Sequence, residues 1–217
     1  MHIDHNSYGS IALAWLICAV LIIIARLLIG SSTVFWVIAA VILMIAVWQT
    51  LFFRVPVRKA AGSASVITAV ADGKIVIKKK VFEPQFLNRE CIQVSIFMDF
   101  FDVHANFWPA DGVVTYYKYY PGKHFMAFKP KASEENEHAC TGMRTDDGKD
   151  ILFKQLAGTF ARRIVCYSEP GMKTKAGEQC GIIKFGSRID MFLPTDADIK
   201  VEIGDKVRAC ESVIALL

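Results

Sequence analysis

Paired cysteine motifs are absent from this sequence, which has six cysteines in 217 residues and none of them in a CxxC arrangement. Their spacing predicts neither a metal site nor a thioredoxin-like redox pair, and their number excludes a small disulfide-stabilised scaffold. An excess of charge of one sign is also missing, because 25 basic residues stand against 21 acidic ones. A net charge of +4 does not by itself indicate a nucleic-acid partner. We expect a reduced domain that faces the cytosol.

Charge is nearly absent from residues 11–53, where Arg26 is the only formally charged side chain. Two apolar runs, residues 11–29 and 34–53, are each about 20 residues long, enough for a helix to cross a hydrocarbon core of about 30 Å. A polar Gly-Ser-Ser-Thr sequence separates them and is typical of a tight turn. A cleaved signal peptide is the alternative, but no basic segment precedes the first run and the apolar length is about twice that of a signal-peptide core. We therefore predict a two-helix membrane anchor over residues 1–53.

Basic residues follow the second apolar run directly, at Arg54, Arg58 and Lys59. The positive-inside rule then places residues 54–217 in the cytoplasm, and a hairpin returns the N-terminus to the same side. Arg26 stands near a helix end, from which its long side chain can reach the membrane interface. The expected location is the cytoplasmic (inner) membrane.

Short runs of β-branched and aromatic residues, separated by Asp-Gly and Pro-Gly turn signals, predict a mainly β domain over residues 54–217. Residues 150–163 have the apolar spacing of a helix and form the best helix candidate of this domain, although Gly158 weakens it. The strands that we expect cover residues 65–70, 74–81, 91–98, 112–120 and 164–167.

An internal repeat occupies the end of the chain, where residues 170–183 and 203–216 align without gaps. The two copies share a glycine, a lysine, a second basic residue, an alanine and a glutamate at equivalent positions. This pattern favours the two halves of a small β-sandwich, similar to biotinyl/lipoyl-like hammerheads. The predicted fold class is mainly β (α+β), a β-sandwich or hammerhead-like domain preceded by a transmembrane helical hairpin, and such a repeat specifies a fold rather than a chemistry.

Three segments carry residues with chemical potential. Asp72 lies in an Asp-Gly pair, which taken alone predicts a hairpin turn. His104 lies in an apolar strand-then-loop region, where a lone histidine is more often a structural residue than a catalyst. Gly186 and Ser187 are enclosed by apolar, strand-like sequence, where a Gly-Ser pair is normally a bulge or bend.

Together and in this order, these segments resemble the short-form phosphatidylserine decarboxylases, a family of membrane-associated pyruvoyl enzymes. The resemblance runs from about residue 54 to residue 217. Three departures occur: Val70 stands where a proline is common, Phe107 replaces a basic residue, and His138 stands where an arginine is expected. The strings that carry the resemblance are ADGKI (71–75), VSIFM..FDVHAN..P..G (94–112), PGK (121–123), KASEENE (131–137), LAGTFARRIVCY (156–167) and PG...KAGE..G.I.FGSRID.FLP (170–194).

The resemblance implies a proenzyme that cuts itself between Gly186 and Ser187. The products are a β chain, residues 1–186, and an α chain, residues 187–217, which stay together as a heterodimer; the resemblance leaves higher oligomers open. Ser187 becomes a covalent pyruvoyl cofactor, which forms a Schiff base with phosphatidylserine in the membrane and converts it to phosphatidylethanolamine.

The same resemblance assigns roles to the candidate residues. His104 is the expected base for Ser187, and Asp72 orients that histidine or stabilises its charge, in the manner of a Ser/His/Asp arrangement. Ser133 and Asn136, in the KASEENE string, are expected to contact the lipid head group.

Aromatic residues flank His104, at Phe100, Phe101, Phe107 and Trp108, and we expect some of them to form an apolar rim that enters the bilayer. Two alternatives stand beside the pyruvoyl decarboxylase. One is a membrane-anchored β-sandwich adaptor without catalysis, which would remain a single intact chain. The other is a decarboxylase of a different serine phospholipid.

Overall fold

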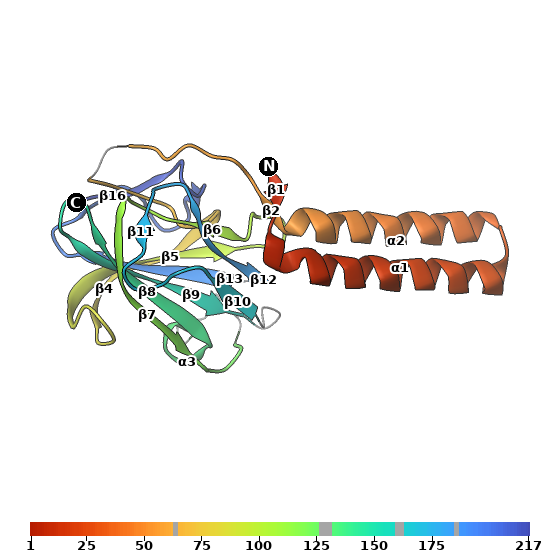
Figure 1. The fold of residues 1–217 in the computed structure, drawn as a ribbon, viewed down its shortest axis with the longest axis horizontal. Helices are drawn as coiled ribbons and strands as arrows, with labels where there is room; N and C mark the ends of the chain where they lie inside the picture. Colours follow the sequence, from red (N-terminus) through yellow and green to blue (C-terminus); the bar gives the residue numbers. More distant parts are fainter. Residues whose placement is uncertain (63–64, 126–131, 159–162, 185–186) are drawn as a thin grey trace. The chain divides into compact units, whose positions relative to one another are not determined.

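The chain forms two compact units, Met1–Pro56 and Val57–Leu217, in a computed structural model that describes residues 1–62, 65–125, 132–158, 163–184 and 187–217 (Figure 1). Within its described residues, the first unit consists mainly of two helices, α1 (Tyr8–Ile29) and α2 (Thr33–Phe52). Its two short strands, β1 (His2–Ile3) and β2 (Arg54–Val55), pair antiparallel, and a 3-10 turn, η1 (His5–Ser7), follows β1.

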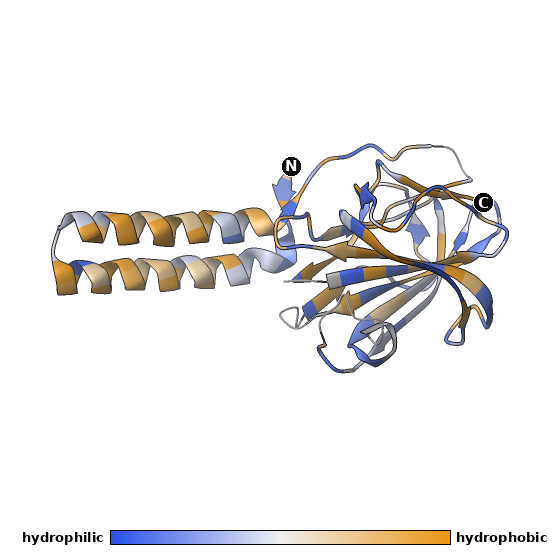
Figure 2. Cartoon of the chain, turned by 180° about the vertical axis from the view of Figure 1, so that it is seen from behind, coloured by the Kyte–Doolittle hydropathy of each residue, from blue (hydrophilic) through white to orange (hydrophobic). Residues whose placement is uncertain are grey.

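The ends of the two helices follow from the local sequence. Helix α1 ends at Gly30, whose φ of 65° favours glycine, and Ser32 caps α2 by accepting the N–H of Phe35 at 3.4 Å. The indole N–H of Trp15 donates to the hydroxyl of Thr50 at 2.9 Å and so links the helices. Both helices are long and apolar enough to cross a membrane, and Figure 2 shows apolar residues along both. The predicted helical hairpin is confirmed.

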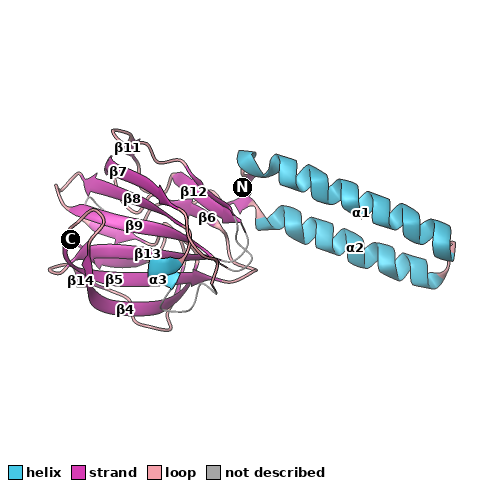
Figure 3. Ribbon diagram, turned by 90° about the horizontal axis from the view of Figure 1, so that it is seen from below, coloured by secondary structure: helices cyan, strands magenta, loops and turns pink. Residues whose placement is uncertain are grey.

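The second unit is built, in the residues described, around an eight-stranded antiparallel sheet that curls along its length (Figure 3). The strand order is β11-β7-β8-β9-β13-β5-β4-β15. The bounds are β4 Gly73–Glu83, β5 Arg89–Met98, β7 Gly112–Tyr120, β8 His138–Thr145, β9 Asp150–Ala157, β11 Lys173–Thr174, β13 Ser187–Pro194 and β15 Lys206–Val207; the short helix α3, Ala132–Glu135, lies between β7 and β8.

Two three-stranded sheets complete the described part of this unit. One has the order β10-β12-β6 and the other β14-β16-β3. Their strands are β3 Val66–Thr68, β6 Ala105–Phe107, β10 Arg163–Cys166, β12 Gln179–Lys184, β14 Asp198–Ile199 and β16 Val213–Leu216. Buried side chains of all three sheets share one apolar core, which includes Ile67, Ile96, Ile183 and Ile189. The mainly β fold class is therefore confirmed.

The internal repeat is visible in this architecture. Its first copy supplies β11 and β12, and its second supplies β15 and β16. Strands β11 and β15 lie at the two opposite edges of the eight-stranded sheet, whereas β12 and β16 are the central strands of the two small sheets. The repeat thus builds two similar halves, each of which joins one edge of the large sheet to one small sheet.

The predicted helix over residues 150–163 is wrong, because Asp150–Ala157 form strand β9 between β8 and β13. Residues 159–162 lie outside those described. Ile151 and Phe153 face the apolar core, while Leu152 packs in a second buried cluster with Phe192. A central strand that is buried on both faces carries a nearly continuous apolar run, whose spacing also fits a helix, and tertiary pairing decides between the two.

Candidate active site

Ser187 begins strand β13 at one end of the eight-stranded sheet. Its backbone stands in register with Met98 at the end of β5 and with Ala157 at the end of β9, and both neighbours are fully buried. Lys74 of β4 pairs with Phe97, so Gly73 comes level with Met98 in the same row. Gly186 and the side chain of Ser187 lie outside what the structure describes, so the site is defined by the elements around them.

His104 lies between β5 and β6 and is fully buried. Its carbonyl accepts the N–H of Ile183, near the end of strand β12, at 3.2 Å. Its ring nitrogen Nδ1 lies 3.1 Å from the carbonyl oxygen of Asp102. A carbonyl can only accept, so Nδ1 carries the proton and, in the neutral ring, Nε2 carries the lone pair. Strand β12, which precedes Ser187 in the chain, is therefore bonded to the backbone of His104. Ser187 itself pairs with the end of β5, the strand that leads to His104.

Asp72 precedes β4 and lies next to the same loop. The carbonyl of Val70 accepts the N–H of Phe107, and that of Pro109 accepts the N–H of Thr68. The chain that leads to Asp72 therefore runs beside the segment that follows His104. The sequence-predicted Asp72, His104 and Ser187 thus belong to one end of the sheet, with Ser187 described by its backbone.

The carboxylate of Asp72 is bound by groups that the sequence analysis did not assign to it. Arg58 donates to both carboxylate oxygens, through Nη1 to Oδ1 and through Nη2 to Oδ2 at 2.7 Å. The backbone N–H of Ala209 also donates to Oδ1, at 2.8 Å. The hydrogen bond to Asp72 raises the pKa of Arg58, so the guanidinium keeps its positive charge. The hydrogen bonds described for the Asp72 carboxylate come from Arg58 and Ala209. A contact through which Asp72 orients the His104 ring therefore stays a prediction.

A tight turn between β5 and His104 exposes two aromatic rings. The N–H of Phe101 donates to Asp99 at 2.8 Å, and the N–H of Asp99 donates to Asp102 at 2.9 Å. Phe100 and Phe101 are 42% and 76% exposed at this turn. Burial raises the pKa of Asp102, and the nearby charges of Asp99 and Asp72 also raise it, which is a further sign that Asp72 lies close to this loop.

Phe107 and Trp108, by contrast, cannot belong to an exposed rim, because they are 2% and 1% exposed. Trp108 packs edge-on against Phe153, with ring centroids 5.9 Å apart, in the main apolar core. The prediction of a rim is wrong for these two residues. All three residues of strand β6, which ends at Phe107, are buried.

Ser133 and Asn136 are held by protein groups near the start of β13. The hydroxyl of Ser133 donates to Asp190 at 2.8 Å and accepts from Gln93 at 3.2 Å and from Arg188. Asn136 donates to the carbonyl of Ala157, the register partner of Ser187, at 2.8 Å. Both residues therefore lie at the predicted end of the sheet, and their contact with a head group stays a prediction.

A buried charged cluster covers the face of the sheet that is turned away from the main core. Arg188 and Asp190 are both fully buried and make a two-pronged contact, with Nε to Oδ1 at 2.8 Å and Nη2 to Oδ2 at 3.0 Å. The sequence analysis gave these residues no role. The signal was present, because two opposite charges separated by one residue in a buried strand share a face and must pair.

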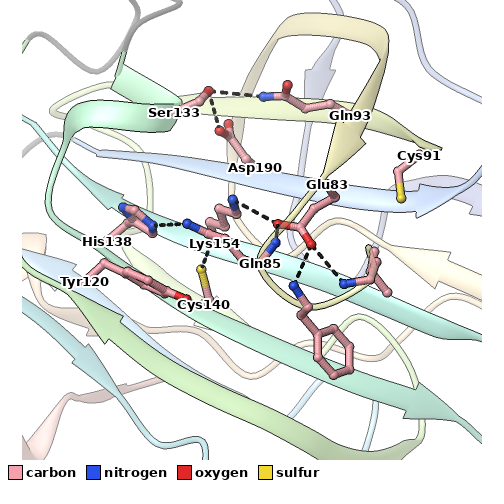
Figure 4. A network of polar contacts seen from close by, with 12 residues as sticks. Glu83, Gln85, Cys91, Gln93, Tyr120, Ser133, His138, Cys140, Lys154 and Asp190 are labelled. Atoms are coloured by element: carbon pink, nitrogen blue, oxygen red, sulfur yellow. Dashed lines mark hydrogen bonds and ion pairs between the residues drawn. The ribbon is translucent and has the colours of Figure 1, made fainter. Parts of the chain in front are cut away.

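A second buried ion pair, between Lys154 and Glu83, lies on the strand next to Asp190, and Figure 4 shows this pair together with Asp190. Lys154 of β9 lies 3.3 Å from Glu83 at the end of β4, and the side chains are 7% and 0% exposed. Glu83 also accepts backbone N–H groups of the turn that follows it, from Phe86 and Leu87, each at 2.9 Å. Burial by itself would raise the pKa of Glu83, but these N–H groups and the charge of Lys154 lower it overall.

His138 adjoins this network in the neutral state. Its Nδ1 donates to the carbonyl of Asn136 at 2.6 Å, and Gln85 lies 3.4 Å from its Nε2. The ring stacks on Tyr120 with centroids 4.9 Å apart. Burial lowers the pKa of His138, which favours this neutral form. The residue that departs from the family pattern at this position is thus accommodated as an uncharged, stacked ring.

Two buried amides lie between the sheets, close to the row of Ser187. Gln155 donates to Asn106 at 2.9 Å, and Asn106 lies 4.0 Å from the sulfur of Met98, the register partner of Ser187. Both amides are fully buried, and Oε1 of Gln155 has no hydrogen-bond partner among the described residues. An unpaired buried acceptor is costly, so this amide pair marks a place where a further polar group would be stabilised.

Comparison with known proteins identifies the class to which this site belongs. Residues 45–215 match the family model described as phosphatidylserine decarboxylase. A phosphatidylserine decarboxylase proenzyme of Amoebophilus asiaticus (strain 5a2) is 44% identical over 172 residues, which cover 79% of this chain and 76% of the relative.

Two further relatives carry the same name. The proenzyme of Nitrosomonas europaea is 44% identical over 172 residues, 79% of each chain, and that of Parabacteroides distasonis is 38% identical over 190 residues, 87% of this chain and 86% of the relative. The chain therefore belongs to the phosphatidylserine decarboxylase proenzyme family, as the sequence motifs predicted.

Proposed function

We propose that this protein decarboxylates phosphatidylserine to phosphatidylethanolamine and CO2, after a self-processing step at Gly186-Ser187. The observation that carries the proposal is the convergence of three motif residues on one end of the sheet in a chain of this family. The chain just before Asp72 is bonded to the segment that follows His104, and His104 is bonded to the strand that leads toward Ser187. An adaptor without catalysis would not require a buried histidine at this position.

The self-processing step uses only groups of the chain. The Ser187 hydroxyl gives its proton to a base and attacks the Gly186 carbonyl carbon. The base returns that proton to the Ser187 nitrogen as the C–N bond breaks, which leaves an ester and a free amine. Loss of the Ser187 α-proton and of the Gly186 carboxylate then leaves a dehydroalanine. Its imine tautomer takes up water and releases ammonia, which yields a pyruvoyl group at the new N-terminus. A serine hydroxyl needs a base for such an attack, because it is a weak nucleophile when unaided.

His104 is our candidate for that base. With the proton of Nδ1 held by the carbonyl of Asp102, Nε2 is the nitrogen that can accept a proton. Because Nδ1 is occupied in this way, Asp72 acts on His104 through its charge: a nearby carboxylate stabilises the imidazolium that forms when the proton is taken. After processing, His104 in its protonated form can donate a proton to the carbon from which CO2 has left.

The buried surroundings of Ser187 suit a small covalent carbonyl group. When present, a pyruvoyl group supplies an electrophilic carbonyl for the substrate amine and an electron sink for the electrons left by CO2. Asn106 and Gln155 offer polar amide groups in the adjoining buried space, including the unpaired Oε1. Ser133 and Asn136, at the same end of the sheet, are our candidates for contacts with the head group.

The two chains that processing creates would stay together without a covalent bond. The proposed α chain begins with β13, which pairs over Ser187–Pro194 with β5 and over Ser187–Phe192 with β9. Ile189, Met191 and Leu193 anchor it in the apolar core. A strand held on both sides and buried on both faces does not dissociate readily. We therefore propose an αβ heterodimer.

The membrane has two proposed contacts. Helices α1 and α2 would span the cytoplasmic membrane, with the catalytic unit on the cytoplasmic side because basic residues follow α2. The exposed pair Phe100 and Phe101, on the loop between β5 and His104, would enter the lipid interface beside the site.

A decarboxylation assay tests this function. Purified protein in mixed micelles should release CO2 from phosphatidylserine labelled at the serine carboxyl and form phosphatidylethanolamine. His104→Ala should impair processing, decarboxylation or both, whereas Lys59→Gln, an exposed change, should leave both intact. A processed protein that leaves phosphatidylserine unchanged but decarboxylates another serine phospholipid would refute the substrate assignment and favour the alternative.

A further inference from the structure

The sequence Ala-Asp-Gly occurs twice in the catalytic unit, once before β4 and once before β7. In each copy the aspartate accepts a backbone N–H from the alanine at the equivalent position of the C-terminal repeat: Asp72 from Ala209 at 2.8 Å, and Asp111 from Ala176 at 2.7 Å. The two Asp-Gly turns therefore perform the same structural task in the two halves of the fold.

The following glycine is needed in both copies for the same reason. A Cβ at Gly73 would lie 2.2 Å from the carbonyl oxygen of Phe97, and one at Gly112 would lie 2.2 Å from that of Arg144. The backbone of the next strand is the obstacle in each case. The duplicated turn thus accounts for the aspartate, the glycine and the contact with the repeat, without reference to catalysis.

One feature of the first copy is not duplicated. Arg58 forms a two-pronged ion pair with Asp72, donates to the carbonyl of Ala209 at 3.1 Å and lies 3.8 Å from Glu211. The side chains of Arg58 and Asp72 are 10% and 12% exposed. Asp111 is exposed, and the structure shows no ion pair for it among the residues it describes.

The two copies also differ in their distance along the sheet from Ser187. Gly73 comes level with Met98, which pairs with Ser187 at the start of β13. Gly112 instead pairs with Thr145 of β8. Followed across β8 and β9, that row reaches β13 at its other end, near Pro194. The ion pair with Arg58 is therefore made at the copy in the row of Ser187, and among the described residues no such pair is made at the other copy.

We propose that Arg58 is a positioning residue, which fixes the Asp72 carboxylate in place and balances its charge beside His104. This inference rests on the proposed roles of His104 and Asp72. A buried carboxylate is stabilised in its charged form by a two-pronged guanidinium partner, and the fork fixes its orientation in a way that a lysine cannot reproduce. Arg58 does so from the chain segment that directly follows the helical unit.

Opposite effects on the pH dependence follow from the two charges. Arg58→Gln leaves the negative charge of Asp72 unbalanced, which raises the pH at which His104 becomes a base by roughly one unit. Asp72→Asn leaves the positive charge of Arg58, which lowers that pH by a similar amount. The double variant restores the wild-type position, although with a slower rate.

The other charges nearest to these groups are the same in the Arg58 and Asp72 variants. Asp99 and Asp102 belong to the loop of His104, Lys206 of β15 acts on Asp102, and Glu211 lies beside Arg58. Lys184 follows Ile183, which is bonded to the carbonyl of His104. Because none of these residues is changed, differences in the pH profile report the Arg58–Asp72 pair.

The experiment measures the rate of processing of newly made full-length protein, and then the decarboxylation rate, from pH 5.5 to pH 9. Arg58→Gln, Arg58→Lys, Asp72→Asn and the double variant are compared with two controls. Asp111→Asn removes the equivalent carboxylate charge at the second copy, while its amide oxygen can still accept the N–H of Ala176, and Lys59→Gln removes a neighbouring charge. Near-ultraviolet circular dichroism checks the fold of each protein. If Arg58→Gln does not fold, Arg58→Lys, which keeps the positive charge, still tests the proposal.

We expect shifts of opposite sign for Arg58→Gln and Asp72→Asn, a rate loss of about tenfold with a smaller shift for Arg58→Lys, and wild-type profiles for both controls. Impaired Asp72→Asn together with a wild-type profile for folded Arg58 variants would refute the positioning role alone. A wild-type profile for Asp72→Asn would instead refute the proposed role of Asp72. Equal loss in Asp111→Asn and Asp72→Asn would mean that both aspartates are purely structural.

Discussion

Replacing Lys154 by methionine should strongly destabilise the catalytic unit. The ammonium of Lys154 lies 3.3 Å from Glu83 and 4.8 Å from the ring centroid of Phe192, and 7% of the lysine side chain is exposed. Without it, the Glu83 carboxylate stays fully buried with three backbone N–H groups but no opposite charge. Breaking a buried pair from one side typically costs about 3–5 kcal/mol.

For a unit of this size, such a loss lowers the melting temperature by roughly 2–4 °C per kcal/mol, or about 6–20 °C in all. Thermal unfolding of the detergent-solubilised full chain, followed by near-ultraviolet circular dichroism, measures it. The double variant Lys154→Met with Glu83→Gln should recover much of the stability, because the unpaired charge is gone. Arg144→Met, which breaks an exposed pair with Asp150, is the matched control and should change the melting temperature little. A melting temperature of Lys154→Met within 2 °C of wild type would refute the buried-pair account.

Three further predictions concern titration, thiol reactivity and lipid contact. Burial lowers the pKa of His138, so as the pH falls the unfolded chain takes up a proton at this residue before the folded chain does. The stability that His138 contributes is therefore present above about pH 6.5 and lost as the pH falls through the lowered pKa. His138→Gln should flatten the acid side of a plot of stability against pH, and an unchanged slope would contradict this. Burial raises the pKa of Cys140 and of Cys210 to about 12, so neither thiol should react with a maleimide at pH 8 in the native protein, and rapid labelling located by peptide mass would argue against their burial. Changing Phe100 and Phe101 together to serine should lower decarboxylation of vesicle lipid several-fold but not that of a short-chain, soluble phosphatidylserine, and equal loss on both substrates would exclude a lipid-contact role.

Much of the fold could be predicted from local patterns. The apolar runs and the polar turn between them predicted both helices, and the run of β-branched and aromatic residues over 112–120 predicted strand β7 with the bounds that the structure shows. These elements have a clear period and strong turn signals at their ends. Strand β9 was missed because it is buried on both faces, so its sequence lacks the alternation that distinguishes a strand from a helix.

The candidate site was predictable only where motif residues carry it. Asp72 and His104 belong to recognisable strings, and the fold brings them to the end of the sheet where Ser187 begins β13. Arg58 was used only to predict the membrane orientation. Its ion pair with Asp72 could not be predicted, because that contact depends on how the segment after α2 folds over the repeat. The burial of the aromatic residues was equally hard to predict. Phe101 and Phe107 lie in similar sequence surroundings, but the fold leaves Phe101 exposed and buries Phe107.

The intact mass of the purified, denatured protein tests the central claim most directly. We predict two chains, residues 1–186 and 187–217, the smaller of which carries a pyruvoyl group in place of serine, lacks a free α-amine and reacts with borohydride or hydroxylamine. Ser187→Ala should give one chain of 217 residues and no decarboxylation, because no hydroxyl remains to attack Gly186. An active wild-type protein that remains one uncut chain, or a small chain that begins with an ordinary serine amine, would contradict the account.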